Sequence, residues 1–245
     1  MPEKQGDIQA YYDTVATGYY KQYQRENLMT SGAYPANYFR LQILVNRLAN
    51  SRAKKIYEVG VGDGTPLVTL AKMGFDVAGC DISESMVEAC KKNFSDAGLP
   101  PERIQWADIE DSITFANQLR EGPFDAVIAV GVMPHVKNDS LFLANLKMML
   151  PQGGKVFVEF RNKLFSLFTL NRYTKEFILD ELLYTVDPRV KDAVAQELDQ
   201  RLAIDQPALR LKTEDGQIDY DAIPAKFHNP LELTEFFQGE GFINP

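Results

Sequence analysis

One stretch decides how this chain folds, and it reads Glu58-Val59-Gly60-Val61-Gly62-Asp63-Gly64-Thr65. It follows a short apolar run, and its three glycines stand at alternate positions. Glycine lets the backbone turn sharply and approach a ligand closely, and the helix expected after this loop directs its N-terminal amides at whatever binds there. The stretch is therefore typical of the first strand-to-helix turn of a nucleotide-binding α/β fold.

Short apolar runs alternate with helical stretches around this loop. Strands are predicted at 55–59, 76–80, 104–107, 125–130 and 155–160, and helices at 65–73, 83–97, 111–120 and 139–150. This alternation indicates an α/β fold with a doubly wound, mostly parallel Rossmann-like sheet, because right-handed crossovers place helices on both faces.

Four regions are predicted along the chain. Residues 1–50 have an aromatic-rich helical pattern and are expected to form an N-terminal helical lid, and 51–160 form the Rossmann-like core. Residues 161–226 interrupt the alternation of strands and helices with a mostly helical insertion, expected to form a cap over the sheet. Residues 227–245 return to the core through one more helix, at 229–241.

Composition excludes several classes of protein. The 245 residues carry 26 Lys and Arg against 34 Asp and Glu, a net charge of −8, which disfavours a nucleic-acid partner. The longest apolar stretch, 126–134, is about half of the roughly 20 residues that a membrane helix needs, so no membrane partner is expected. The start of the chain has no apolar signal core, which predicts a cytoplasmic location. Cys80 and Cys90 match no zinc-ligand spacing, and no metal is expected.

Acidic residues around the glycine loop separate two candidate nucleoside cofactors. Asp81 ends the second predicted strand, 21 residues after Gly60, where a carboxylate can bind ribose hydroxyls. A dinucleotide fingerprint reads G-x-G-x-x-G, whereas the third glycine here comes one residue early, at Gly64. Glu58 and Asp63 would repel a pyrophosphate but favour the cationic sulfonium and amino groups of S-adenosylmethionine.

The chain resembles the class I S-adenosylmethionine-dependent methyltransferases of the small-molecule type over 55–160 and 229–242, with motifs at 58–65, 81–83, 107–109 and 124–128. The resemblance implies that the glycine loop holds the methionine moiety, Asp81 the ribose and Asp108 the adenine amino group. The predicted cofactor-binding set is Glu58, Gly60, Gly62, Gly64, Asp81, Ile82, Met86, Asp108, Ile109, Val130 and Tyr19. For Met86, core packing is an alternative to lining the adenosine pocket.

The substrate side is predicted from segments at the carboxyl edge of the sheet. His135 follows the fourth strand and is the candidate catalytic base, with a buried structural histidine as the equally weighted alternative. Tyr11 stands in an aromatic group, with Tyr12 and Tyr19, that is expected to include a lid contact, whereas packing in an aromatic face is the favoured role for any single tyrosine of the group. Arg161 and Arg172 open the insertion, where they either bind an anionic group of the acceptor or lie on a solvated helix face.

The predicted function is methyl transfer from S-adenosylmethionine to a small metabolite, with oxygen favoured over nitrogen as the acceptor atom and an anionic acceptor as one option. Two alternatives remain: an NAD-dependent oxidoreductase on the same fold, and an inactive cofactor-binding scaffold. In the resembled family the sheet finishes with an antiparallel hairpin, whereas three residues follow Phe242 here. We therefore expect either further C-terminal residues in the natural protein or strands supplied by a second chain, as in a homodimer.

Overall fold

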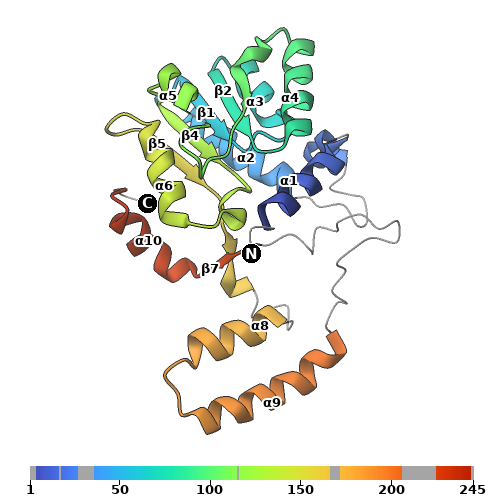
Figure 1. Cartoon of the computed structure of the whole chain (residues 1–245), viewed down its shortest axis with the longest axis vertical. Coiled ribbons are helices and arrows are strands. Elements are labelled where there is room, and N and C mark those ends of the chain that lie inside the picture. The colour runs from blue at the N-terminus through green and yellow to red at the C-terminus, as the bar shows by residue number, and fades with distance from the viewer. Residues whose placement is uncertain are drawn as a thin grey trace. The chain divides into compact units, whose positions relative to one another are not determined.

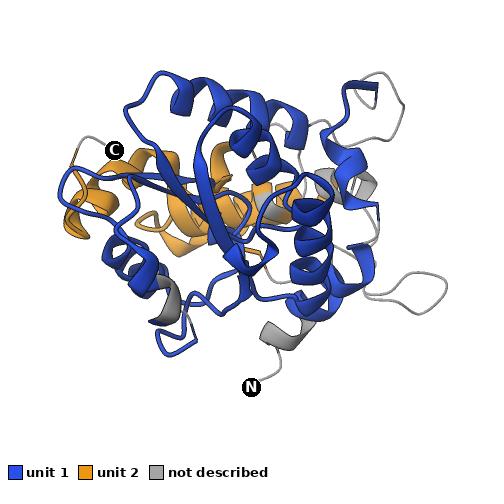
Figure 2. Cartoon of the chain, turned by 90° about the horizontal axis from the view of Figure 1, so that it is seen from above, with its two compact units in different colours: residues 1–159 blue, residues 160–245 orange. Residues whose placement is uncertain are grey.

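The computed structural model describes residues 4–16, 18–26, 36–114, 116–165, 172–205 and 225–243. Contacts within the chain divide it into two compact units, residues 1–159 and residues 160–245, which Figure 2 colours separately. Two parts of the predicted insertion, 166–171 and 206–224, lie outside the described residues.

The first unit is built on a five-stranded parallel sheet (Figure 1). Its strands are β1 (Lys55–Val59), β2 (Asp76–Asp81), β3 (Ile104–Trp106), β4 (Ala126–Ala129) and β5 (Lys155–Val158). Their order is β3-β2-β1-β4-β5, and each neighbouring pair is parallel. The sheet confirms the predicted doubly wound fold, and the strand ends differ from prediction by at most two residues.

Helices connect the strands and precede the sheet. They are α1 (Lys4–Val15), α2 (Ala36–Ala49), α3 (Thr65–Lys72), α4 (Glu84–Asp96), α5 (Ala116–Glu121) and α6 (Asp139–Met148), with 3-10 turns η1 (Tyr19–Tyr23), η3 (Pro101–Arg103) and η4 (Met133–His135). Helix α4 begins where the Ser83 side chain accepts a hydrogen bond from the Met86 amide, a standard N-cap.

Helix α5 begins later than the sequence predicts. The expected start at 111 was wrong, because Asp111 and Thr114 form a turn instead of the first helical residues. The Asp111 carboxylate accepts from the Ile113 amide at 3.0 Å, and the Thr114 amide donates to the Asp111 carbonyl at 3.1 Å. Short Asp and Thr side chains favour such local bonds over helix.

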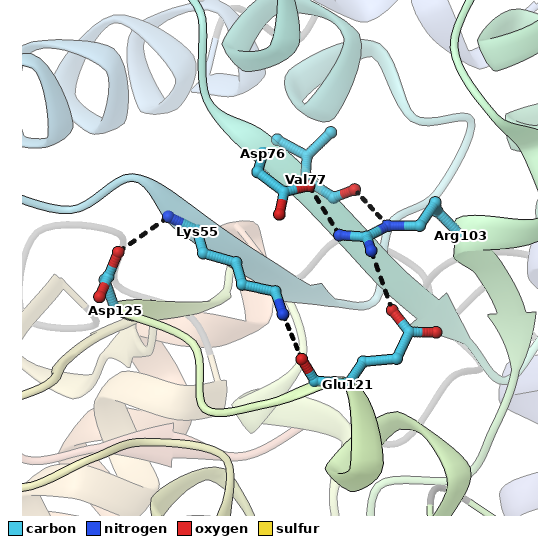
Figure 3. A network of polar contacts seen from close by, with 6 residues as sticks. All are labelled: Lys55, Asp76, Val77, Arg103, Glu121 and Asp125. Atoms are coloured by element: carbon cyan, nitrogen blue, oxygen red, sulfur yellow. Dashed lines mark hydrogen bonds and ion pairs between the residues drawn. The ribbon is translucent and has the colours of Figure 1, made fainter.

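A polar network joins the amino ends of the strands (Figure 3). Arg103, just before β3, contacts Asp76 at 2.7 Å, Glu121 at 3.3 Å and the Val77 carbonyl at 3.3 Å. The Lys55 ammonium donates to the Glu121 carbonyl, and the Lys55 amide donates to Asp125 at 2.9 Å. These contacts belong to the edge opposite the glycine loop, so the carboxyl edge is left for a binding site.

Apolar side chains fill the sheet's interior and the spaces under its helices. The fully buried ones include Leu48, Ile56, Leu67, Leu70, Phe94, Ile104, Ala126 and Ile128. Strand β4 is buried along its whole length, as expected for a central strand covered by helices on both faces. This core fixes the positions at which the strands end, and so the positions of the loops that follow them.

The second unit is mostly helical in its described part. It contains β6 (Arg161–Asn162), η5 (Lys163–Phe165), α8 (Arg172–Glu176), the π-helix η6 (Phe177–Leu182), α9 (Pro188–Asp205), β7 (Phe227–His228) and α10 (Pro230–Gly239). Strands β6 and β7 pair in parallel, with Arg161 opposite Phe227 and Asn162 opposite His228. Asn229 caps α10 by accepting from the Leu231 amide at 3.2 Å, close to the predicted helix start.

Within the described residues, none of the helices combines the length and the apolar character that crossing a membrane requires.

Candidate functional site

The strand order reverses at β1 and β4, and two loops meet there. Strand β1 has β2 as its neighbour on one side and β4 on the other. In an open α/β sheet, ligands usually bind at the carboxyl ends of the strands where the order reverses in this way. The loop after β1 contains Gly60, and the loop after β4 contains Val132. A Cβ atom on Gly60 would lie 2.4 Å from Val132 Cγ2, which shows how closely the two loops pack.

Asp81 ties the glycine loop to the end of β2. Its carboxylate accepts from the Gly62 amide and from the Ser83 amide, each at 2.9 Å, and the residue is 7% exposed. Burial raises the pKa of Asp81 to about 6, against the lowering effect of these amides, and the nearby Asp13 raises it further. The carboxylate is thus held rigidly at the site and desolvated.

Two more buried carboxyl groups lie at the same loop. Glu58 and Asp63 are each 2% exposed, and burial raises the pKa of both. For Glu58, the neighbouring Asp81 and Asp63 raise the pKa further. Among the described residues, Glu58 Oε2 and Asp63 Oδ2 have no hydrogen-bond partner. Buried acids left in this state favour a cationic ligand and disfavour a pyrophosphate, so the site fits the sulfonium and amino groups of S-adenosylmethionine.

Aromatic residues of η1 cover the glycine loop. The Tyr19 ring lies 3.5 Å from the position that a Cβ on Gly62 would take. The pKa of Tyr23 is raised by burial and by its neighbours Tyr19, Glu58 and Asp63, and it is lowered by Arg40. Tyr19 belongs to the predicted set, whereas Tyr23 and Arg40 were not singled out, since the sequence offered only an aromatic-rich run as a signal.

The loop after β3 extends along the carboxyl edge to α6. Asp108 begins this loop, and its carboxylate accepts from the Glu110 amide at 2.9 Å. The Asn145 side chain donates to the Ile109 carbonyl at 2.7 Å, and Glu110 accepts from the amides of Lys137 and Asn138 at 2.9 and 2.8 Å. These bonds fix Asp108 and Ile109 at the edge that also holds the glycine loop.

The comparisons with known proteins bear on this geometry. Residues 57–158 match the family model described as a methyltransferase domain. This part of the chain is therefore a methyltransferase domain with a Rossmann-like fold.

Proteins with similar sequences are named methyltransferases. The chain is 26% identical over 151 residues to a ubiquinone biosynthesis O-methyltransferase of Pasteurella multocida, which covers 60% of this chain and 62% of that protein. It is 24% identical over 212 residues to a demethylmenaquinone methyltransferase of Tropheryma whipplei, covering 84% and 82%. The match to the first relative thus spans about three fifths of that protein's length.

A solved structure shares the fold of the methyltransferase domain. It is the magnesium protoporphyrin IX methyltransferase of Synechocystis PCC 6803 with bound SAH, at a TM-score of 0.59 and 15% identity. The similarity covers 97% of this chain and 89% of that one.

The remaining predicted residues of the methyltransferase domain occupy different environments. Ile82 is half-buried, and its carbonyl accepts from Trp106 Nε1 at 2.7 Å. Val130 is half-buried directly after β4, whereas Met86 is 1% exposed and lies inside the core. The burial of Met86 favours its packing role over contact with a ligand.

His135 meets the N-terminal helix. The Tyr12 ring packs edge-on against the His135 ring, with centroids 6.2 Å apart and planes at 80°. Tyr11 contacts Tyr12 in the same way, at 5.2 Å. Helix α1 therefore brings two aromatic rings to the loop after β4 and reaches the candidate base.

Arg161 and Arg172 belong to the second unit. The Arg161 guanidinium lies 5.6 Å from the centroid of the Phe227 ring, a cation–π contact across the β6–β7 pair. Arg172 is half-buried at the first residue of α8. The structure describes these contacts within the second unit, and the acceptor-binding role of both arginines stays a proposal.

Replacing Gly64 by alanine should destabilise the methyltransferase domain by about 2–5 kcal/mol. Gly64 has a φ of +78°, and an added Cβ would lie 2.3 Å from Cys90 Sγ and 3.3 Å from Cys90 Cβ. Urea unfolding measures the loss. Gly98→Ala is the matched control, because Gly98 has a φ of +72° and open space around it. Equal losses in the two variants would contradict steric exclusion at Gly64.

The free energy of unfolding of the ligand-free chain should contain a contribution from Asp81 that grows as pH falls. Its pKa is about 6 in the folded chain, raised from 3.8, so between these values the folded state holds a proton that the unfolded state releases. The gain between pH 7 and pH 5 should be about 1 kcal/mol.

Urea unfolding of the wild type and Asp81→Asn at pH 7, 6 and 5 isolates that contribution. The difference between the two proteins removes the titration of acids that do not sense Asp81, and it reports the titration of Asp81 together with its coupling to Glu58, whose pKa Asp81 raises. A difference that does not change with pH would show that Asp81 titrates normally.

Proposed function

We propose that this protein transfers a methyl group from S-adenosylmethionine to a hydroxyl oxygen of a small metabolite. The observation that carries the proposal is the group of buried carboxyl residues at the glycine loop of a methyltransferase domain. Glu58, Asp63 and Asp81 are nearly inaccessible to water, and two of their oxygens have no hydrogen-bond partner among the described residues. A cofactor with a positive charge compensates these acids, whereas a dinucleotide pyrophosphate adds to their repulsion.

Different residues of the chain are proposed to bind different parts of the cofactor. Asp81 would accept hydrogen bonds from the ribose hydroxyls, and its own position is fixed by the amides of Gly62 and Ser83. Glu58 and Asp63 offset positive charge at the glycine loop. Asp108 would hold the adenine amino group, and Ile82 and Ile109 would supply apolar contacts to the adenine. When bound, S-adenosylmethionine supplies an electrophilic methyl group.

His135 acts on the acceptor side. It stands at the carboxyl edge, after β4, and a neutral imidazole there can take the proton from an acceptor hydroxyl. Tyr12 limits the movement of the His135 ring through their edge-on contact. Oxygen is favoured as the acceptor atom because a hydroxyl needs this proton removal, and because a relative is named an O-methyltransferase.

The most detailed part of the proposal concerns the chemical class of the acceptor. Arg161 and Arg172 supply positive charge near the start of the second unit, in a chain whose net charge is −8. An acceptor with a carboxylate or phosphate group suits these arginines.

Two measurements test the proposal. Calorimetry with S-adenosylmethionine, S-adenosylhomocysteine and NAD should show binding of the first two alone. Incubation with a methyl donor labelled in its methyl group and a metabolite extract should then place the label on a compound that gains one methyl group at oxygen. Binding of NAD instead would support an oxidoreductase, and cofactor binding with no labelled product from any extract would support a scaffold.

A further inference from the structure

One side chain of α1 bonds to the first turn of α4. Asp13 Oδ1 accepts a hydrogen bond from the Ser83 hydroxyl and another from the Ser85 amide, at 3.2 Å for the latter. The Ser83 hydroxyl at the same time accepts from the Met86 amide at 3.1 Å. Two helices that are 70 residues apart in sequence are thus joined by a shared set of hydrogen bonds.

The location of Asp13 is unfavourable for α1 itself. Asp13 stands in the last turn of α1, where the helix dipole is negative and a carboxylate is disfavoured. The N-terminus of α4 is positive, and a carboxylate there is favoured. The contact with α4 therefore accounts for an acidic residue that the stability of α1 alone does not explain.

Other side chains of α1 also contact the first unit. Of the side chains described on this helix, Ile8 reaches the core at 8% exposure, and Tyr12 meets His135. A helix of 12 residues is marginal by itself in water, and Gly6 weakens this one. The bonds from Asp13 therefore add a specific polar anchor to the contacts that position α1.

The contact lies beside the proposed ribose site. The Ser83 amide donates to Asp81 at 2.9 Å, two residues along the chain, and Asp13 is close enough to raise the pKa of Asp81. One residue before Asp13, Tyr12 meets the candidate base His135. Helix α1 therefore extends from the proposed cofactor site to the proposed acceptor site.

We propose that Asp13 fastens α1 beside the proposed cofactor site and so sets the rate at which S-adenosylmethionine and its product leave. Asp13 acts through Ser83 and Ser85 as a positioning residue. This inference rests on the proposed function of the site. It adds a residue that controls cofactor release to those that bind the cofactor.

Release kinetics test the proposal directly. Trp106 is the only tryptophan of the chain and bonds to the Ile82 carbonyl beside the site, so its fluorescence can report the departure of S-adenosylhomocysteine in a stopped-flow chase. Asp13→Ala should speed release about tenfold, because two hydrogen bonds are lost. Asp13→Asn keeps an acceptor oxygen and should stay within about threefold of the wild type. Thr14→Ala is the control, since Thr14 bonds only within α1 among the described contacts.

Hydrogen exchange of the ligand-free chain gives a second measurement. Amides of α1 should exchange faster in Asp13→Ala than in Thr14→Ala, while the amides of β1 and β4 keep their protection. Equal release by the wild type and Asp13→Ala would overturn the proposal, whether or not α1 exchanges faster. Absence of cofactor binding by the wild type would refute the proposed function and the release role together, an outcome distinct from equal release.

Discussion

Asp81→Asn should lower the affinity for S-adenosylmethionine by a hundredfold or more while leaving the fold intact. The change removes the charge from a carboxylate proposed to accept two bonds from ribose, each worth roughly 1.5–3 kcal/mol when charge-assisted. Its amide oxygen can still accept one of the two backbone bonds from Gly62 and Ser83. Calorimetry measures the affinity, and circular dichroism checks the fold.

Two comparisons sharpen this prediction. Asp76→Asn, at the opposite end of β2, is the matched control and should leave affinity unchanged, because Asp76 is paired with Arg103 at the other edge of the sheet. Asp81→Asn should lower the affinity for S-adenosylmethionine and the affinity for S-adenosylhomocysteine equally, since both contain the ribose. Unchanged affinity in folded Asp81→Asn would show that the ribose site lies elsewhere.

Glu58→Gln should lower the affinity for the positively charged S-adenosylmethionine more than the affinity for S-adenosylhomocysteine, which has no sulfonium charge.

His135→Ala should lower turnover by about a hundredfold or more, with cofactor affinity changed less than threefold. The prediction follows from the proposed removal of a proton from the acceptor hydroxyl. Turnover is measured across pH 6 to 9 once an acceptor is known, and affinity is measured by calorimetry. The variant also loses the ring contact with Tyr12, so its thermal unfolding is recorded alongside.

His228→Ala serves as the control for His135. His228 is the chain's other histidine and lies in β7 of the second unit. Normal turnover of His135→Ala at neutral pH would rule out the base role and favour an acceptor that is already nucleophilic. If the alanine variant fails to fold, His135→Gln keeps a polar side chain of similar reach, and a folded but slow glutamine variant would retain the base assignment.

The sheet and its carboxyl edge could be predicted from sequence. The loop from Gly60 to Gly64 and the alternation of strands and helices are local patterns, and the parallel topology brings their ends to one edge whatever the details. For that reason, the sequence alone was enough to expect Asp81 and Asp108 at the same edge. Helix α5 was misplaced because the side chains of Asp111 and Thr114 compete locally with helix.

The parts that could not be predicted depend on contacts between distant segments. Asp13 meets Ser83, and Tyr23 comes close to Glu58 and Asp63, only after the N-terminal helices pack on the core. No local spacing encodes these meetings, since an acid in α1 and a tyrosine in η1 look like ordinary surface residues in sequence. Their roles become visible through burial, hydrogen bonds and the pKa shifts that neighbouring charges produce.

The pairing of β6 with β7 has an evolutionary consequence. Arg161 and Asn162 lie opposite Phe227 and His228, so the two ends of the segment that contains α8 and α9 lie side by side and close it at one point. A segment closed in this way can lengthen, shorten or be exchanged between homologues with little disturbance to its flanks. If this segment contacts the acceptor, as proposed, changes within it would alter the choice of acceptor and leave the residues proposed to bind the cofactor in place.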